Sequence, residues 1–307
     1  MSKFEQPIIV PKGTVFKEYQ VLTPEEELKL KMGGQRPESR QESQGKTSIE
    51  QAAEIMGTDF LGPDAVEKSL GVRLEQRDVP AIPFSKEDLE RARELGQMLI
   101  LRISKSPDDE TLSMKKLNDL LKERFAKEGK GKVLYDEAGW KQNEDFYTSE
   151  APQTAWALVS KEIVPGSTSK NYLEQTEILA TYIQNSVFKD RPMPQEYADA
   201  IAELESQKTG IAALMGSNWQ EAAKRLAELK LNELTRHTPV EALYDTDVRL
   251  LVHGDRLLEK TYTWTVRRLS GGKLVLVGYA DADGARVSAD EPGLRDDALG
   301  VSFSRSQ

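Results

Sequence analysis

The spacing of apolar residues changes from a helical period to a strand period in the last fifth of the chain. Before residue 250, apolar side chains mostly recur every three or four positions, which predicts amphipathic helices. After residue 261, apolar and polar residues alternate or apolar residues run together, which predicts β-strands. The pattern therefore predicts an α+β fold with a strand-rich C-terminal region.

Capping residues and glycines divide the helical part into segments. Ser85 is suited to begin a strong helix within residues 80–102, because Asp88 follows three positions later and Leu89, Ala92, Leu95 and Leu99 share one face. Ser169, Ser217 and Thr238 are expected to cap later helices. The expected helices cover residues 48–56, 64–70, 80–102, 112–126, 170–184, 195–208, 217–234 and 238–250. The helices at 195–208 and 217–234 are expected to pack as a hairpin.

Several segments have the character of strands or of the loops that join them. The run TAWALVS at 154–160 predicts a buried strand, and an aromatic-rich loop with a short strand precedes it at 132–148. Tyr262–Arg268 and Lys273–Tyr279 flank Ser270–Gly271–Gly272, which is a hairpin pattern. Leu299–Phe303 predicts a half-buried closing strand, and residues 280–298 are expected to form a long functional loop.

Composition suggests two regions of different size. Residues 1–79 are expected to form an N-terminal extension, with short helices and a flexible, polar linker near 31–46. Residues 80–307 are expected to form one larger domain, in which the helical hairpin 195–234 is an insertion. No internal repeat is visible.

The overall charge and the rare residue types exclude several classes of function. The net charge of -9 argues against a nucleic-acid binder, because phosphate binding needs a concentrated basic face. No apolar run approaches the roughly 18 residues of a membrane span, and no apolar secretion signal is visible. With no cysteine and only His237 and His253, neither a metal centre nor a cofactor is expected. We therefore expect a cytoplasmic protein.

The acidic residues of 281–297 are the candidates for chemistry. Asp281, Asp283 and Gly284 resemble the beginning of a calcium loop, but the later ligands of that pattern are missing. Asp290, Glu291, Asp296 and Asp297 could pair as acid and base if a pocket separated their pKa values. A hydrolase, or a calcium-dependent binding enzyme, that uses these carboxylates is the alternative function. His237 is interpreted as a capping or surface residue, and His253 as a turn residue.

A rigid frame of glycines, apolar residues and one tryptophan surrounds these polar positions. The segment Thr235-Arg236, Pro239–Ala242 and Tyr244 resembles the helix that opens the second half of C-type-lectin folds of the formylglycine-generating-enzyme type. The later frame resembles the variable proteins of diversity-generating retroelements. Its matching positions are Leu258-Glu259, Tyr262–Thr265, Gly271-Gly272, Leu274-Val275, Val277-Gly278, Gly284, Pro292-Gly293 and Leu299–Ser306.

This resemblance implies a C-type-lectin-like fold and a hypervariable ligand-binding function without catalysis. In that family, error-prone reverse transcription at template adenines rewrites the end of the gene, here about residues 261–307. The partner would be an unknown protein or another macromolecule, and an oligomer is possible. Formylglycine generation itself is excluded, because that chemistry needs cysteine. The implied variable positions are Val266, Arg267, Leu269, Lys273, Tyr279, Asp281, Asp283, Arg286, Ser288, Asp290, Leu294, Arg295, Asp296 and Asp297.

Overall fold

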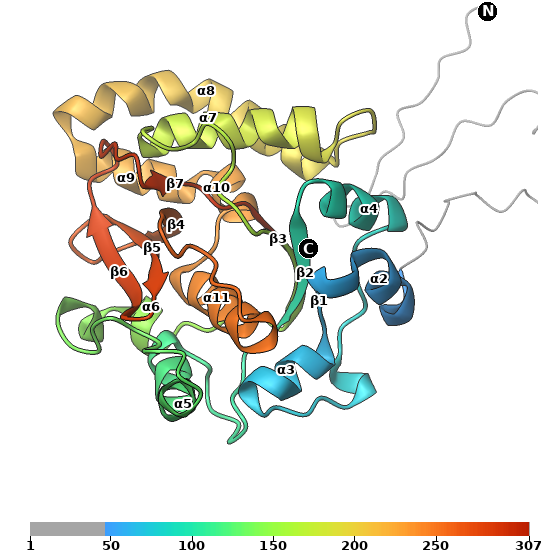
Figure 1. Ribbon diagram of the computed structural model, residues 1–307. Helices are drawn as coiled ribbons and strands as arrows, with labels where there is room; N and C mark the ends of the chain where they lie inside the picture. The colour runs from blue at the N-terminus through green and yellow to red at the C-terminus, as the bar shows by residue number, and fades with distance from the viewer. Residues whose placement is uncertain (1–46, 307) are drawn as a thin grey trace, which may run out of the picture. The chain divides into compact units, whose positions relative to one another are not determined.

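Two four-stranded β-sheets with helices around them form the framework of the protein in a computed structural model (Figure 1). The structure describes residues 47–306, which belong to one packed unit, Gly45–Gln307. The domain boundary predicted between residues 79 and 80 falls inside this unit. The predicted linker at 31–46 lies outside the described residues. The mixture of helices and two sheets makes the fold α+β.

The first sheet joins segments from both ends of the described chain. Its order is β1 (Phe60–Leu61), β2 (Gln97–Arg102), β3 (Ala155–Ser160) and β8 (Ser304–Ser306). β1 runs parallel to β2, and the other neighbours are antiparallel. All of β2 and nearly all of β3 are buried, which confirms the strand predicted at 154–160.

The second sheet contains the predicted hairpin. Its order is β6 (Gly284–Asp290), β5 (Leu274–Asp281), β4 (Tyr262–Arg268) and β7 (Leu299–Gly300). The prediction of one long loop over 280–298 is wrong in its first half. A tight turn leads from β5 directly into β6, which pairs with β5 along its whole length, and only residues 291–298 remain a loop.

Most of the N-terminal helices begin and end as their caps predict. Ser48 and Ser85 form capping boxes with Gln51 and Asp88. The prediction of one helix across 80–102 is wrong beyond residue 94, because Gly96 adopts a φ of 68° and the apolar run after it enters the first sheet. The helices of this part are α2 (Ile49–Met56), η1 (Gly57–Asp59), α3 (Pro63–Leu70), η2 (Gln76–Asp78), α4 (Lys86–Glu94), α5 (Met114–Lys127), η3 (Trp140–Asn143) and α6 (Asp145–Thr148).

The later helices differ from the prediction at two caps and in their extent. The helix predicted over 195–208 continues to Ser217, and the helix predicted over 217–234 is broken at the extended residue Leu229. Asn171 caps α7 instead of Ser169, and Asn218 caps α9 instead of Ser217, which is the last residue of α8. Thr238 caps α11 with a capping box, as predicted. The expected helical hairpin is present as α8 and α9. The helices are α7 (Tyr172–Tyr182), η4 (Ile183–Val187), α8 (Gln195–Ser217), α9 (Trp219–Glu228), α10 (Lys230–Thr235) and α11 (Pro239–His253). None of the helices within 47–306 combines the length and apolar character that a membrane crossing requires.

Two apolar clusters lie on opposite faces of the second sheet. Val275 belongs to the cluster that also contains the first sheet, α5 and α11. Trp264, Leu274 and Leu276 belong to the other cluster, together with residues of α7–α10. In Figure 1, α11 lies between the two sheets, and β6 is the outer strand of its sheet. The sheet is therefore fixed on both faces, while one edge faces outward.

A candidate ligand-binding edge of the C-terminal sheet

The edge of the second sheet carries a cluster of tyrosines around one arginine. The rings of Tyr262 and Tyr279 lie 4.9 Å apart between centroids. The guanidinium carbon of Arg286 lies 4.5 Å from the ring centroid of Tyr135 and 5.8 Å from that of Tyr279. Because Tyr135 is 50% exposed, solvent reaches this cluster. Such a cluster can bind a partner through aromatic contact and through cation–π interactions.

A glycine in β5 explains how this cluster forms. Tyr262, Gly278 and Arg286 are direct neighbours across β4, β5 and β6. A Cβ at Gly278 would lie 2.5 Å from Tyr262 Cα and closer still to the Thr261 carbonyl oxygen. The register of β5 and β6 shifts just after Gly278, where Tyr279 has a φ of 43°. Such an irregularity redirects a side chain away from the regular pleat.

Loop 291–298 continues the same edge. Its backbone is tied to the beginning of α7 by hydrogen bonds from Tyr172 N to Pro292 O (3.0 Å) and from Ser169 N to Asp296 O (2.8 Å). Burial raises the pKa of Tyr262. The nearby charge of Arg286 lowers this pKa, whereas Tyr279 and Asp296 raise it further. The loop ends beside Tyr262, whose backbone N donates a hydrogen bond to Ala298 O (2.7 Å), and it carries the exposed Asp296.

The predicted variable positions spread along the length of the second sheet and into the loop after it. Asp281 and Asp283 lie at the turn between β5 and β6, Arg286, Ser288 and Asp290 follow along β6, and the four candidates from Leu294 to Asp297 lie in the loop. Arg267, Leu269 and Lys273 lie around the β4–β5 turn, at the end of the sheet where Asp290 pairs with Leu274, and Arg267 pairs with Glu150. Arg295 pairs with Glu174 and lines an open groove of about 670 Å³ between α7, α8 and the loop.

One predicted position does not face solvent. Val266 is 5% exposed, and its backbone N donates a hydrogen bond to His237 O, so its inclusion in an exposed surface is wrong. The alternating pattern at the end of β4 breaks at a bulge between Trp264 and Arg268, which is why the sequence could not assign its face. Leu269 and Leu294 are half-buried against the apolar clusters. The remaining candidates are half-buried or exposed.

The carboxylates of 281–297 do not converge on a common point. Asp281, Asp290 and Asp296 each accept a hydrogen bond of 2.8 Å from a backbone N–H one or two residues further along the chain. Such bonds stabilise local turns. Within the described part of the chain, no group of three or more His, Cys, Asp or Glu side chains is arranged to hold a metal ion.

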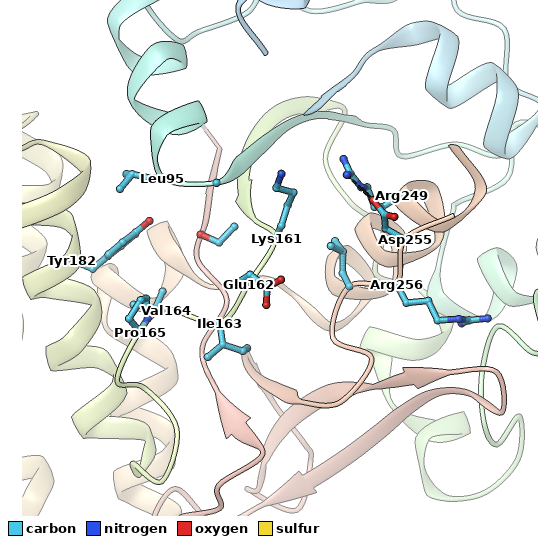
Figure 2. A pocket seen from close by; sticks show the side chains of 13 residues that line it. Leu95, Lys161, Glu162, Ile163, Val164, Pro165, Tyr182, Arg249, Asp255 and Arg256 are labelled. Atoms are coloured by element: carbon cyan, nitrogen blue, oxygen red, sulfur yellow. Dashed lines mark hydrogen bonds and ion pairs between the residues drawn. The ribbon is translucent and has the colours of Figure 1, made fainter. Parts of the chain in front are cut away.

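Two pockets lie away from this edge, near the end of the first sheet. The larger has a volume of about 410 Å³ and opens between the end of α7, the segment after β3 and the end of α11 (Figure 2). A chamber of about 10 Å³ shares Ser160, Lys161 and Leu257 with it and reaches His237 and Asp245. The chamber is large enough for about one water molecule.

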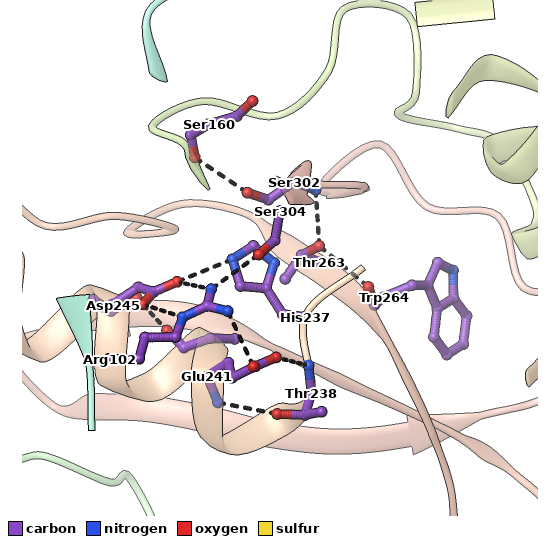
Figure 3. A network of polar contacts seen from close by, with 12 residues as sticks. Arg102, Ser160, His237, Thr238, Glu241, Asp245, Thr263, Trp264, Ser302 and Ser304 are labelled. Carbon is purple, nitrogen blue, oxygen red and sulfur yellow. Dashed lines mark hydrogen bonds and ion pairs between the residues drawn. The ribbon is translucent and has the colours of Figure 1, made fainter. Parts of the chain in front are cut away.

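A buried polar network lies around this chamber (Figure 3). Arg102 forms ion pairs with Asp245 (2.6 Å) and Glu241 (3.0 Å), and His237 Nε2 lies 3.2 Å from Asp245. Burial raises the pKa of Asp245, but Arg102 and His237 outweigh burial and hold that pKa below its usual range. His237 is only 2% exposed, so its interpretation as a capping or surface residue is wrong.

The network holds the two halves of the fold together. Arg102 lies on β2, Asp245 on α11 and Ser304, which accepts a hydrogen bond from Arg102, on β8. The pair of His237 and Asp245 resembles two members of a catalytic triad. However, Arg102, His237 and Asp245 are all buried around a chamber that is too small for an organic substrate. We therefore assign the network to structure.

No protein-family profile, curated protein or solved structure matches this chain. The fold and the candidate site are therefore described from the geometry of this chain alone.

Proposed function

We propose that this chain is a hypervariable ligand-binding protein and that a retroelement rewrites the codons of its C-terminal edge. The display edge comprises Tyr279, Arg286, Ser288 and Asp290 with loop 291–298. The C-type-lectin-like scaffold is part of this proposal, with α8–α10 as its helical insertion. The catalytic alternative has no comparable support, because three carboxylates of this region, Asp281, Asp290 and Asp296, accept hydrogen bonds within their own turns.

The observation that carries the proposal is the contrast in burial between neighbouring positions. Leu274 and Leu276 on β5 are buried, whereas the β6 residues opposite them, Asp290 and Ser288, are half-exposed. Substitution of exposed residues usually changes stability by only about 0.5 kcal/mol, whereas truncation of core residues costs several times more. The edge can therefore change its side chains while the sheet stays folded.

The chemistry of the edge favours a partner that carries basic groups. Four exposed acidic residues lie in the turn before β6 and in the loop after it, namely Asp283, Glu291, Asp296 and Asp297, and the cation Arg295 is already paired with Glu174. Tyrosines supply contact area at a low entropy cost, and negative charge favours encounter with positive partners.

The decisive experiment is to sequence the DNA around the gene. We expect a near-identical repeat of the last codons beside a reverse transcriptase gene, with differences confined to adenines of the repeat. The genetic code makes this prediction more specific. Changing only the two adenines of the codon AAC gives codons for Tyr, Asp, Arg, Ser, Leu and Val. A repeat codon AAC would therefore explain every candidate residue except Lys273.

The frame supplies the internal control. Codons for the buried residues Leu274, Leu276, Val301 and Phe303 should be the same in the gene and in the repeat. If no repeat exists, or if its differences fall equally on frame and edge codons, the proposal is wrong.

A further inference from the structure

The 410 Å³ pocket has a charged end and an apolar end, and it is separate from the display edge. Figure 2 shows Lys161, Arg249 and Asp255 on one side and Leu95, Val164 and Tyr182 on the other. Its volume falls within the range of small-molecule sites, about 300–1,000 Å³. A pocket of this polarity suits a ligand with a charged head and an apolar body.

A largely buried carboxylate, the 16% exposed side chain of Asp59, holds the two cations in place. Asp59 accepts a hydrogen bond from Lys161 Nζ (2.7 Å) through one oxygen and from Arg249 (2.9 Å) through the other. The side chains of Lys161 and Arg249 are 28% and 9% exposed, so both heads are largely withdrawn from water. Asp59 balances one of the two positive charges from the largely buried side, and the other is balanced only by the exposed Asp255.

The remaining anions near this end are accessible to water. Asp255 pairs with Arg249 (2.8 Å), but its side chain is 61% exposed, and Glu162 is exposed as well. Exposed ion pairs contribute little, about 0–1 kcal/mol. An incoming anion can therefore displace or share the contact of Asp255 with little loss.

The opposite end offers apolar contact and one hydroxyl group. Val164 is buried and Leu95 is half-buried there, and Leu257, which also lines the small chamber together with Lys161, is buried. The Tyr182 hydroxyl accepts a hydrogen bond from Gln97 Nε2 (3.2 Å), and among residues 47–306 no acceptor for its own proton is recorded. This hydroxyl can donate to a polar atom within the ligand.

We propose that this pocket binds a small organic acid, with its anionic head beside Lys161 and Arg249 and its apolar body against Leu95, Val164 and Leu257. The binding is a property of the constant part of the chain and does not depend on the display edge. It gives the protein a second ligand of a different chemical class.

Three eight-carbon probes that differ only in the head group test this assignment. The full chain is titrated by calorimetry with octanoate, 1-octanol and octylamine. We expect saturable binding of octanoate at concentrations up to about 1 mM and affinities at least about tenfold lower for the other two. Absence of octanoate binding, or equal binding of octanol, would overturn the proposal.

Two substitutions separate the charged end from the apolar end. Lys161→Met removes the charge and keeps the length of the side chain, and it should weaken octanoate binding by at least about tenfold. Leu95→Trp fills the apolar end and should abolish binding while leaving Lys161 in place. Lys189→Met, on an exposed lysine outside the pocket, is the matched control and should bind as the natural chain does.

Thermal unfolding of each variant shows whether it is folded. If Lys161→Met does not fold, Leu95→Trp still decides the question. Unchanged octanoate affinity in a folded Lys161→Met variant, or in a folded Leu95→Trp variant, would exclude this pocket as the site.

Discussion

Replacing Gly278 with alanine should destabilise the C-terminal sheet strongly. The new Cβ would lie 2.5 Å from Tyr262 Cα and nearer to the Thr261 carbonyl oxygen, so the backbones of β4 and β5 must separate. Overpacking of this kind costs about 1–3 kcal/mol. The separation also strains the hydrogen bond from Tyr279 N to Thr261 O (3.0 Å), which contributes about 0.5–1.5 kcal/mol. We expect a total loss of about 2–4 kcal/mol.

The hairpin contains its own control for this substitution. A Cβ at Gly271, in the turn between the same two strands, would meet no heavy atom within 4 Å. Gly271→Ala should therefore change stability by no more than about 0.5 kcal/mol.

Urea unfolding, followed by far-UV circular dichroism, measures both variants under one set of conditions. The unfolding midpoint of Gly278→Ala should fall well below that of Gly271→Ala, with similar slopes. If the two free energies of unfolding agree within about 1 kcal/mol, the close approach of β4 and β5 that forms the tyrosine cluster is refuted.

Two further substitutions test the edge and a buried acid. Ser288→Arg should change the free energy of unfolding by about 0.5 kcal/mol or less, whereas Leu276→Ala, at the residue directly opposite in register, should lower it by about 2–5 kcal/mol. The midpoints of urea unfolding compare the two variants. Equal losses would contradict the idea that side chains on β6 can change without cost to the sheet. Burial raises the pKa of Asp247 well above its usual value, partly offset by Arg256, so its contribution to stability is present below about pH 4 and is lost as the pH rises. Asp247→Asn should therefore unfold at a higher temperature than the natural chain at pH 8, and the difference should shrink toward pH 4; a difference independent of pH would show that Asp247 does not titrate as described.

The sequence predicts local structure best where one residue determines the outcome. Ser48, Ser85 and Thr238 cap their helices as expected, because a cap depends on contacts three residues away. The hairpin at Ser270–Gly272 also follows from its turn chemistry. Such features need no knowledge of the rest of the chain.

Features that depend on distant contacts are the ones that sequence reasoning missed. Residues 98–101 have apolar side chains that suit either a helix or a strand, and pairing with β3 decides in favour of a strand. β6 alternates Ala285, Val287 and Ala289 with polar residues, but its apolar side chains are small, and the ladder with β5 orders it as a strand. Tyr135 joins the tyrosine cluster only because Leu134 bridges to Ala285, so nothing in its own neighbourhood indicates this role.

The last residues of the chain explain how a stable frame and a free edge coexist. Leu299 and Gly300 pair with β4 in the second sheet, and Ser304–Ser306 pair with β3 in the first. Between them, Val301 and Phe303 are fully buried, and Ser302 N donates a hydrogen bond to Thr263 Oγ1 (2.9 Å).

This closing segment ties both sheets together on the side opposite β6. Because the order of the second sheet is β6-β5-β4-β7, the closing segment and the β6 part of the display edge lie on opposite sides of the same sheet, and loop 291–298 connects them. A change in a side chain on β6 therefore does not reach the contacts that join the two sheets. Sequence variation on the edge and stability of the frame depend on different residues, as a protein that binds through a changing surface requires.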